Sequence, residues 1–249
     1  MKWGLLLLFA VFMAAADEEP TSAKPAPLLK LTSLEWPPYT GADLEGQGEV
    51  TLLLRTLLTE LGYQLQVDFL PWPAAVAKVR HGKEGHLGYF PEYPLTDPDY
   101  LLSVAIGYSE LGLIEQRDNP LLLTDVRQLS TLRFGVVQDY LNMVKLDALI
   151  ATGELKPLIS QSDRDNVLKV LNGELDTAVI DNRVLQYLLQ YDGQIKRKAA
   201  DSLQFSQSLK EHKSLHLVLK NTPQNVELMK KINQKVRLYK TRFFSPSLK

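Results

Sequence analysis

Acidic side chains follow several short apolar runs of this sequence, and they are the residues best suited to chemistry. Glu35 follows "LLKLTS", Glu92 follows "HLGYF", Asp139 follows "RFGVV", and Asp181 follows "LDTAVI". Two such acids facing each other across a cleft could act as general acid and general base. Their spacing does not require this pairing, because Asp139 and Asp181 are equally well placed to cap the helices that follow them.

Large aromatic side chains stand close to these acids in the sequence. The stretch "EWPPYTG" places Trp36 and Tyr39 on either side of two prolines, and "LPWP" places Trp72 between two more. Proline restricts its own φ and the residue before it, so such a turn loses little conformational entropy when it presents a flat ring. The same rings could simply cover an edge of the core, as could Tyr89 and Phe90.

Other catalytic and metal-binding signatures are missing from the sequence. His212 and His216 form the pair "HKSLH" at the entrance to a predicted strand, whereas a zinc pair at this spacing needs one helical face and a third ligand. There is no GxSxG, no Walker-type glycine loop and no GxGxxG after a strand. Without cysteine the chain has no thiol nucleophile, disulfide or lipid-anchor site. We therefore predict no metal, no cofactor and no catalysis.

The elements that must position these residues alternate between short apolar runs and amphipathic stretches. This pattern is typical of an α/β fold with a mostly parallel sheet. In the first part of the chain we predict strands at 29–33 and 64–69, helices at 49–61 and 73–81, and extended runs at 86–90, 101–106 and 108–116. Gly62 and Gly82 mark the ends of the two helices.

A turn-prone connector, "DNPLLLT" at 118–124, separates a second unit in which the alternation restarts. Either Ser162 or Asp163 is expected to cap one of its helices. We predict strands at 133–137, 156–160 and 175–180, helices at 140–151, 163–171 and 183–190, extended runs at 203–206 and 214–219, and a last amphipathic helix from about 226 to 239.

The residues just beyond the predicted strands are expected to meet in one pocket, because ligands of open α/β sheets bind at the carboxyl ends of the strands. Aromatic rings with a few polar groups suit a small ligand that has a flat or aliphatic body and a polar or cationic end. The predicted ligand-binding residues are Trp36, Tyr39, Trp72, Tyr89, Phe90, Glu92, Gln138, Asp139 and Asp181.

The N-terminal stretch "MKWGLLLLFAVFMAAADEEP" predicts a secretory signal peptide, cleaved after Ala16, and residues 17–27 read as a flexible leader. The apolar run is shorter than the ~20 residues of a membrane span, so we expect a soluble exported protein. The formal net charge of −1 provides no basic surface for nucleic acid or an anionic membrane, and neither partner is expected.

Several stretches resemble, in order, those of bacterial periplasmic solute-binding proteins of family 3, which includes the polar amino-acid binders. "LKLTSLEWPPYTG" resembles the opening strand and aromatic turn of that family, and "TDVRQLSTLRFGVVQD" its entry into the second lobe. "VLKVLNGELDTAVIDN" is similar to its late helix, strand and acid, and "SLHLVLKNTPQNVELMKKINQKV" to its return strand and last helix. The resemblance runs over nearly the whole chain after the leader.

The resemblance implies two α/β lobes that close like a hinge over a ligand. One lobe would comprise 28–107 plus 206–249 and the other 108–205, with crossovers near 108–116 and 200–205. By position, Trp36 would stack on the ligand, Trp72 would face it from the other side, and Asp181 would accept its ammonium group. The protein would be a periplasmic monomer whose partners are a small molecule and an inner-membrane ABC permease or a sensor.

One departure from the family concerns the ligand. Its amino-acid binders carry an arginine that forks onto the ligand α-carboxylate, but the matching stretch here, "YPLTDPDYLLS", contains Asp97 and Asp99 and no arginine. The glycine-rich turn expected after Val137 is replaced by "QDYLN". An ordinary α-amino acid is therefore disfavoured, unless an arginine from elsewhere reaches the site; the candidates are Arg80, Arg117 and Arg183.

The leading hypothesis is thus a binding protein for a small solute, amino-acid-like or amine-bearing, without catalysis. An exported lyase-like enzyme on the same scaffold, with Glu92 or Asp181 as general base, is one alternative, since fold does not fix function. A ligand-free interaction protein, whose aromatic residues bind a partner, is the other.

Overall fold

Two sets of parallel strands form the two halves of the protein in the computed structural model, which describes residues 25–199 and 201–244. In the first half, β1 (Leu28–Ser33) pairs with β2 (Gln64–Phe69) on one side and β3 (Gly88–Glu92) on the other. In the second half, β6 (Phe134–Val137) lies between β7 (Leu158–Ser160) and β8 (Thr177–Asp181). The predicted signal peptide and residues 17–24 of the predicted leader lie outside the described ranges.

Two long antiparallel strands join the halves. β5 (Gly107–Gln116) and β10 (Glu211–Lys220) pair with each other over 107–111 and 211–215. β10 then pairs with β3 of the first half, and β5 with β8 of the second, which gives the strand order β2-β1-β3-β10-β5-β8-β6-β7. The predicted α/β class with two crossover strands is confirmed.

The return crossover differs from its predicted place at 200–205. The short strand β9 (Leu203–Phe205) pairs only with the far end of β5, at Ile114–Gln116, while β10 makes the crossing into the first half. Another short strand, β4 (Tyr100–Leu102), also pairs with β10. The lobe boundaries drawn from the sequence, 28–107 plus 206–249 and 108–205, stay a prediction.

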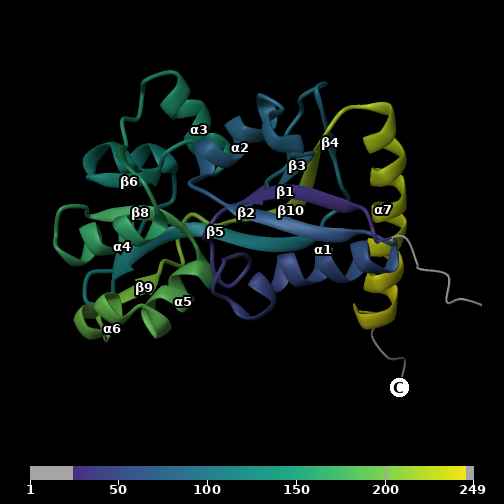
Figure 1. The fold of residues 1–249 in the computed structure, drawn as a ribbon. Coiled ribbons are helices and arrows are strands. Elements are labelled where there is room, and N and C mark those ends of the chain that lie inside the picture. The colour runs from purple at the N-terminus through teal and green to yellow at the C-terminus, as the bar shows by residue number, and fades with distance from the viewer. Residues whose placement is uncertain (1–24, 200, 245–249) are drawn as a thin grey trace, which may run out of the picture.

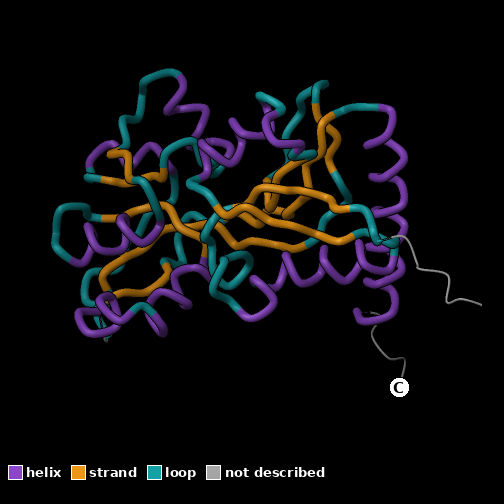
Figure 2. Tube along the Cα trace, in the orientation of Figure 1, coloured by secondary structure: helices purple, strands orange, loops and turns teal. Residues whose placement is uncertain are grey.

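Helices flank the strands of both halves (Figures 1 and 2). The helices of the first half are α1 (Glu49–Glu60), α2 (Trp72–Arg80) and the C-terminal α7 (Pro223–Phe244), which stands at the far right of Figure 1. Those of the second half are α3 (Val144–Ala151), α4 (Asp163–Leu171), α5 (Asn182–Tyr191) and α6 (Gly193–Ala199). Helix α6 was not predicted. No helix among residues 25–199 and 201–244 is both long and apolar enough to cross a membrane.

The buried strands explain why the sequence pattern could be recognised. All residues of β6 and β8 are buried, as expected for parallel strands covered on both faces, and they read as continuous apolar runs. Helix α5 instead buries one stripe, formed by Val184, Leu185 and Leu188. Each such side chain contributes on the order of 1.5–3 kcal/mol when it leaves water.

Helix α3 begins four residues later than the predicted helix at 140–151. Met143 has extended backbone angles, φ −65° and ψ 136°, and the segment before it leaves the strand β6 without helical structure. Tyr140, Leu141 and Asn142 are thereby placed beside the space between the two halves. The apolar spacing in this stretch continues that of the helix, which is why the sequence predicted an earlier start.

Candidate functional site

The aromatic turn after β1 is held by its own backbone and by helix α1. Trp36 and Thr40 exchange two backbone hydrogen bonds, of 2.9 and 3.1 Å. The first amides of α1 donate to the turn, with the Val50 N–H 2.9 Å from the Tyr39 carbonyl oxygen. Gly48 permits this approach, since its φ is +94° and a Cβ there would lie 2.5 Å from the same oxygen. The turn thus has one conformation.

The rings of this turn form a single unit that reaches across to the second half. Trp36 stacks on Tyr39 with 4.6 Å between ring centroids and 25° between planes. The Trp36 indole N–H donates to Asp163 Oδ2 at 3.1 Å, and the Tyr39 hydroxyl donates to Asp181 Oδ2 at 3.1 Å. Both bridges therefore join a donor of the first half to an acid of the second.

Asp181 is buried and already surrounded by donors. It ends β8 and caps α5, where its Oδ1 accepts from the Val184 N–H at 2.9 Å. Its Oδ2 accepts from Ser109 at 2.5 Å as well as from Tyr39, and Tyr93 bonds the same serine at 2.8 Å. Burial raises the pKa of Asp181, and these hydrogen bonds oppose that rise.

Asp163 and Glu92 are two further buried acids beside this network. Asp163 is the first residue of α4, since Ser162 is the cap and its side chain accepts from the Asp165 N–H. Burial, with a smaller contribution from the charge of Asp181, raises the pKa of Asp163 to about 7. Burial also raises the pKa of Glu92 to about 7, although the Tyr93 N–H and Lys213 favour its charged form.

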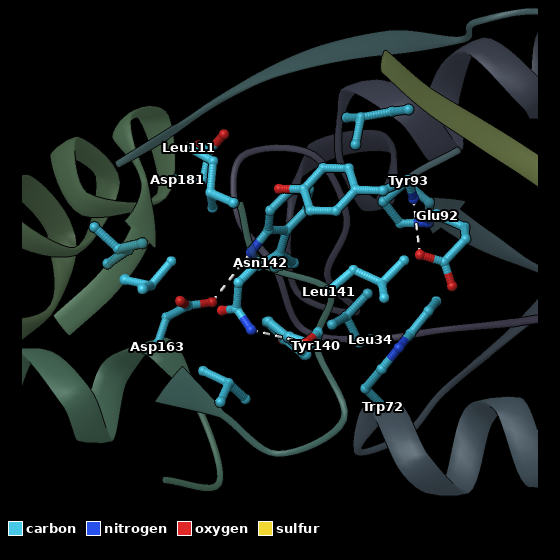
Figure 3. A pocket seen from close by; sticks show the side chains of 16 residues that line it. Leu34, Trp72, Glu92, Tyr93, Leu111, Tyr140, Leu141, Asn142, Asp163 and Asp181 are labelled. Carbon is cyan, nitrogen blue, oxygen red and sulfur yellow. Dashed lines mark hydrogen bonds between the residues drawn. The ribbon is translucent and has the colours of Figure 1, made fainter. Parts of the chain in front are cut away.

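A cavity lies between the two halves and is bordered by all three acids (Figure 3). Figure 3 shows Glu92 and Trp72 on one side of it and Asp163 on the other. Its free volume is about 40 Å³, far below the ~300–1,000 Å³ of typical ligand pockets. The residues that line it are Leu34, Trp36, Trp72, Pro91, Glu92, Tyr93, Leu111, Val137, Tyr140, Leu141, Asn142, Asp163, Val179, Ile180, Asp181 and Leu215.

The structure brings only part of the predicted set to this cavity. Trp36, Trp72, Glu92 and Asp181 line it, whereas the other predicted ligand-binding residues do not. Tyr39 lies behind Trp36, Tyr89 packs edge-on against Trp72 with centroids 5.5 Å apart, and Phe90 is fully buried in the core. Gln138 and Asp139 are exposed, and Gln138 accepts a hydrogen bond from Gln161.

Sequence reasoning missed two polar residues that the second half contributes to the cavity, Asp163 and Asn142. Tyr93 and Tyr140, which follow predicted strands, also line it, although the predicted ligand-binding set did not include them. The sequence did carry a signal for Asp163. Ser162 and Asp163 are both good caps, but a helix needs only one at this position, which left the second side chain to be explained.

The three arginines considered as replacements lie away from the cavity. Arg183 pairs with Glu49 on the surface and lies over the Tyr39 ring at 5.1 Å. Arg117 donates to the carbonyl oxygens of Asp201 and Leu203, and Arg80 is exposed. No arginine lines the cavity among the described residues.

A cluster of possible metal ligands, formed by Asp68, Glu84 and His86, lies elsewhere in the first half. Their ligand atoms lie within 4.8 Å of one another. The Lys78 ammonium lies 2.8 Å from both carboxylates, so a cation already occupies this position. The "HKSLH" pair was predicted at the entrance to a strand, and both histidines lie within the strand β10. They therefore do not share a helical face.

Comparison with known proteins supports the fold. The chain matches no protein-family model, and no curated protein matches it in sequence. Its structure is similar to a histidine kinase sensor domain with similarity to periplasmic binding proteins (13% identity, 88% of this chain and 92% of that one, TM-score 0.73). It is also similar to an ancestral arginine-binding protein bound to arginine (15% identity, 88% of this chain and 94% of that one, TM-score 0.70). A third similar structure is the GluR0 ligand-binding core from Nostoc punctiforme in complex with L-glutamate (15% identity, 88% of this chain and 100% of that one, TM-score 0.64). The fold is thus that of periplasmic binding proteins.

Proposed function

We propose that this protein binds a small, positively charged solute in the cavity between its two halves, either for uptake through an ABC permease or for sensing. The observation that carries the proposal is the composition of the cavity wall. Glu92, Asp163 and Asp181 border the cavity, and no arginine or lysine among the described residues lines it. Acids with nearby aromatic rings suit an ammonium or guanidinium group.

The same wall disfavours an ordinary α-amino acid. Its carboxylate would meet three acids without the bidentate guanidinium that usually satisfies such a group. A cation would instead stabilise the ionised form of the buried acids, because its charge offsets the cost of keeping their negative charges out of water. The expected ligands are therefore amines, or amino-acid derivatives whose carboxylate is masked.

Ligand entry requires the halves to separate, since the free volume is about 40 Å³. Opening breaks the hydrogen bond between Trp36 and Asp163 and the one between Tyr39 and Asp181. The ligand would then take over the carboxylate oxygens that these donors release. We further propose that the protein is exported to the periplasm and acts there as a monomer, without catalysis.

The small volume favours a second candidate, a binding-protein fold that works closed and empty as an interaction protein. In that case the Trp36–Tyr39 unit serves as the permanent filling of the cleft. The two candidates differ in their response to ligand, because only a bound solute stabilises the folded state by mass action.

The test is a melting-temperature screen of the purified chain against amines, amino acids, amino-acid amides and small peptides. A ligand present at 100 times its Kd should stabilise the fold by about 2.7 kcal/mol. Asp181→Asn should abolish this response, while Asp139→Asn, an exposed acid at the neighbouring strand end, should leave it intact. A screen without hits would favour the second candidate, whereas a hit equally strong in Asp181→Asn would contradict the assignment of the cation site to Asp181.

A further inference from the structure

A second and larger hollow adjoins the inner cavity, and the two share Asp163 as a wall residue. Its free volume is about 510 Å³, which falls within the range of small-molecule sites. The loop after β1 forms one wall with Glu35, Pro37, Asp43 and Leu44. The start of α4 and helix α5 form the other, with Ser162, Asp163, Arg164, Val184, Tyr187, Leu188, Tyr191 and Asp192.

This outer hollow carries an excess of negative charge. Its single lining cation among the described residues is Arg164, whose guanidinium is held 2.7 Å from Asp192. Glu35 accepts a hydrogen bond from the Ala42 N–H and has no cationic partner in the part of the chain that the structure describes. Within residues 25–199 and 201–244, the Asp43 carboxylate has neither an ion-pair nor a hydrogen-bond partner. Two acids of the first-half wall are thus available to a ligand.

Two tyrosines of α5 line the same hollow as these acids. Tyr187 and Tyr191 are one helical turn apart, with 4.8 Å between ring centroids and 41° between planes. Tyr191 is 61% exposed, and Leu188 borders the same hollow. An aromatic face next to apolar side chains and carboxylates attracts an organic cation more than a metal ion or an anion.

We propose that the outer hollow is a separate binding site for an aliphatic polyamine, whose methylene chain lies against Tyr187 and Tyr191 while Glu35 and Asp43 hold its ammonium groups. The proposal does not rest on the function assigned to the inner cavity. Since the walls come from both halves, an occupant connects them and favours the closed arrangement. In Figure 1 the loop after β1, in purple, lies beside the green α5.

The test is isothermal titration of the whole chain with spermidine at fixed ionic strength. Tyr191→Leu should weaken binding about threefold to tenfold, whereas Tyr191→Phe, which keeps the ring, should bind as the original chain does. The double change Glu35→Gln with Asp43→Asn should weaken it about tenfold or more. Asp118→Asn, an exposed acid outside the hollow, is the matched charge control.

A further variant separates this site from the inner one. Glu92 borders the inner cavity only, so any effect of Glu92→Gln belongs to the inner site, and the component of spermidine binding that Tyr191→Leu weakens should keep its affinity in Glu92→Gln. Loss of binding in Glu92→Gln with normal binding in the Tyr191 and Glu35/Asp43 variants would overturn the outer site and move the polyamine to the inner cavity. No measurable binding of spermidine, or equal binding in every variant, would also overturn the proposal.

Discussion

Replacing Asp163 with asparagine is expected to make the protein more stable at neutral pH and to leave its stability unchanged below about pH 4. The carboxyl group is buried between the halves, where it accepts one hydrogen bond from the Trp36 indole. Asparagine keeps an oxygen for that bond and cannot ionise. The substitution therefore removes the charge and retains the contact.

The sign and size of the effect follow from the pKa of Asp163, which burial raises from 3.8 to about 7. Between these values the folded state holds a proton that the unfolded chain has lost, so stability falls as pH rises through the interval. Each pH unit in this interval costs up to about 1.4 kcal/mol, so the full interval from pH 3.8 to pH 7 costs about 4 kcal/mol. We expect about 2 kcal/mol, because titration is shared with Asp181 and because opening of the cavity admits water.

The assay is urea unfolding at pH 3.5, 5, 6, 7 and 8, with stability extrapolated to water. The variant and the original chain should differ by less than about 0.5 kcal/mol at pH 3.5 and by about 2 kcal/mol, in favour of Asp163→Asn, at pH 7 and above. Asp139→Asn serves as an exposed control and should follow the original chain throughout. Two parallel curves for Asp163→Asn and the original chain would refute the assignment of a buried, protonated acid at this position.

Two further predictions concern neighbouring contacts. Trp36→Phe keeps a ring against Tyr39 but removes the hydrogen-bond donor to Asp163, so it should loosen the contact between the halves. Small-angle scattering should then show a larger radius of gyration. An unchanged radius would count against a role of the Trp36–Asp163 hydrogen bond in holding the halves together. Asn166 is fully buried, and neither polar atom of its side chain has a hydrogen-bond partner among the described residues. Asn166→Ala should therefore stabilise the fold by about 1 kcal/mol, measured by urea unfolding. Destabilisation by Asn166→Ala would mean that the packing lost with the side chain costs more than the removal of the unpaired buried amide gains.

The sequence predicted most of the fold because strand ends and helix stripes are local signals. The β6 and β8 runs and the helix α5 could be read directly, and the α4 cap was narrowed to Ser162 or Asp163. Helix α6 escaped because Gly193 opens it and lysine and arginine fill its last turn, so it has little apolar periodicity. The place of the return crossover escaped because strand pairing is a property of distant segments.

The site was less predictable because the direction in which a side chain points matters as much as its position in the sequence. Gln138 and Asp139 follow a strand just as Asp181 does, yet both are exposed. Asp139 has a positive φ of 59°, and this local turn directs the chain away from the path a sheet edge alone would suggest. Phe90 stands between two residues near the cavity but lies fully in the core, as alternation along a strand requires.

The closed cavity places the protein's own donors in competition with any cationic ligand. In the closed state the indole of Trp36 and the hydroxyl of Tyr39 bind the same carboxylate oxygens that a cation would need. These donors are neutral, so they fill the hydrogen-bonding positions of Asp163 and Asp181 but offset only part of the cost of burying a negative charge. The raised pKa values of both acids indicate this remaining cost. A positively charged group can relieve that remaining cost, whereas a neutral ligand can only replace one hydrogen bond by another. In the proposed function, selection for cations therefore arises from the cost of burying negative charge that the internal hydrogen bonds do not offset.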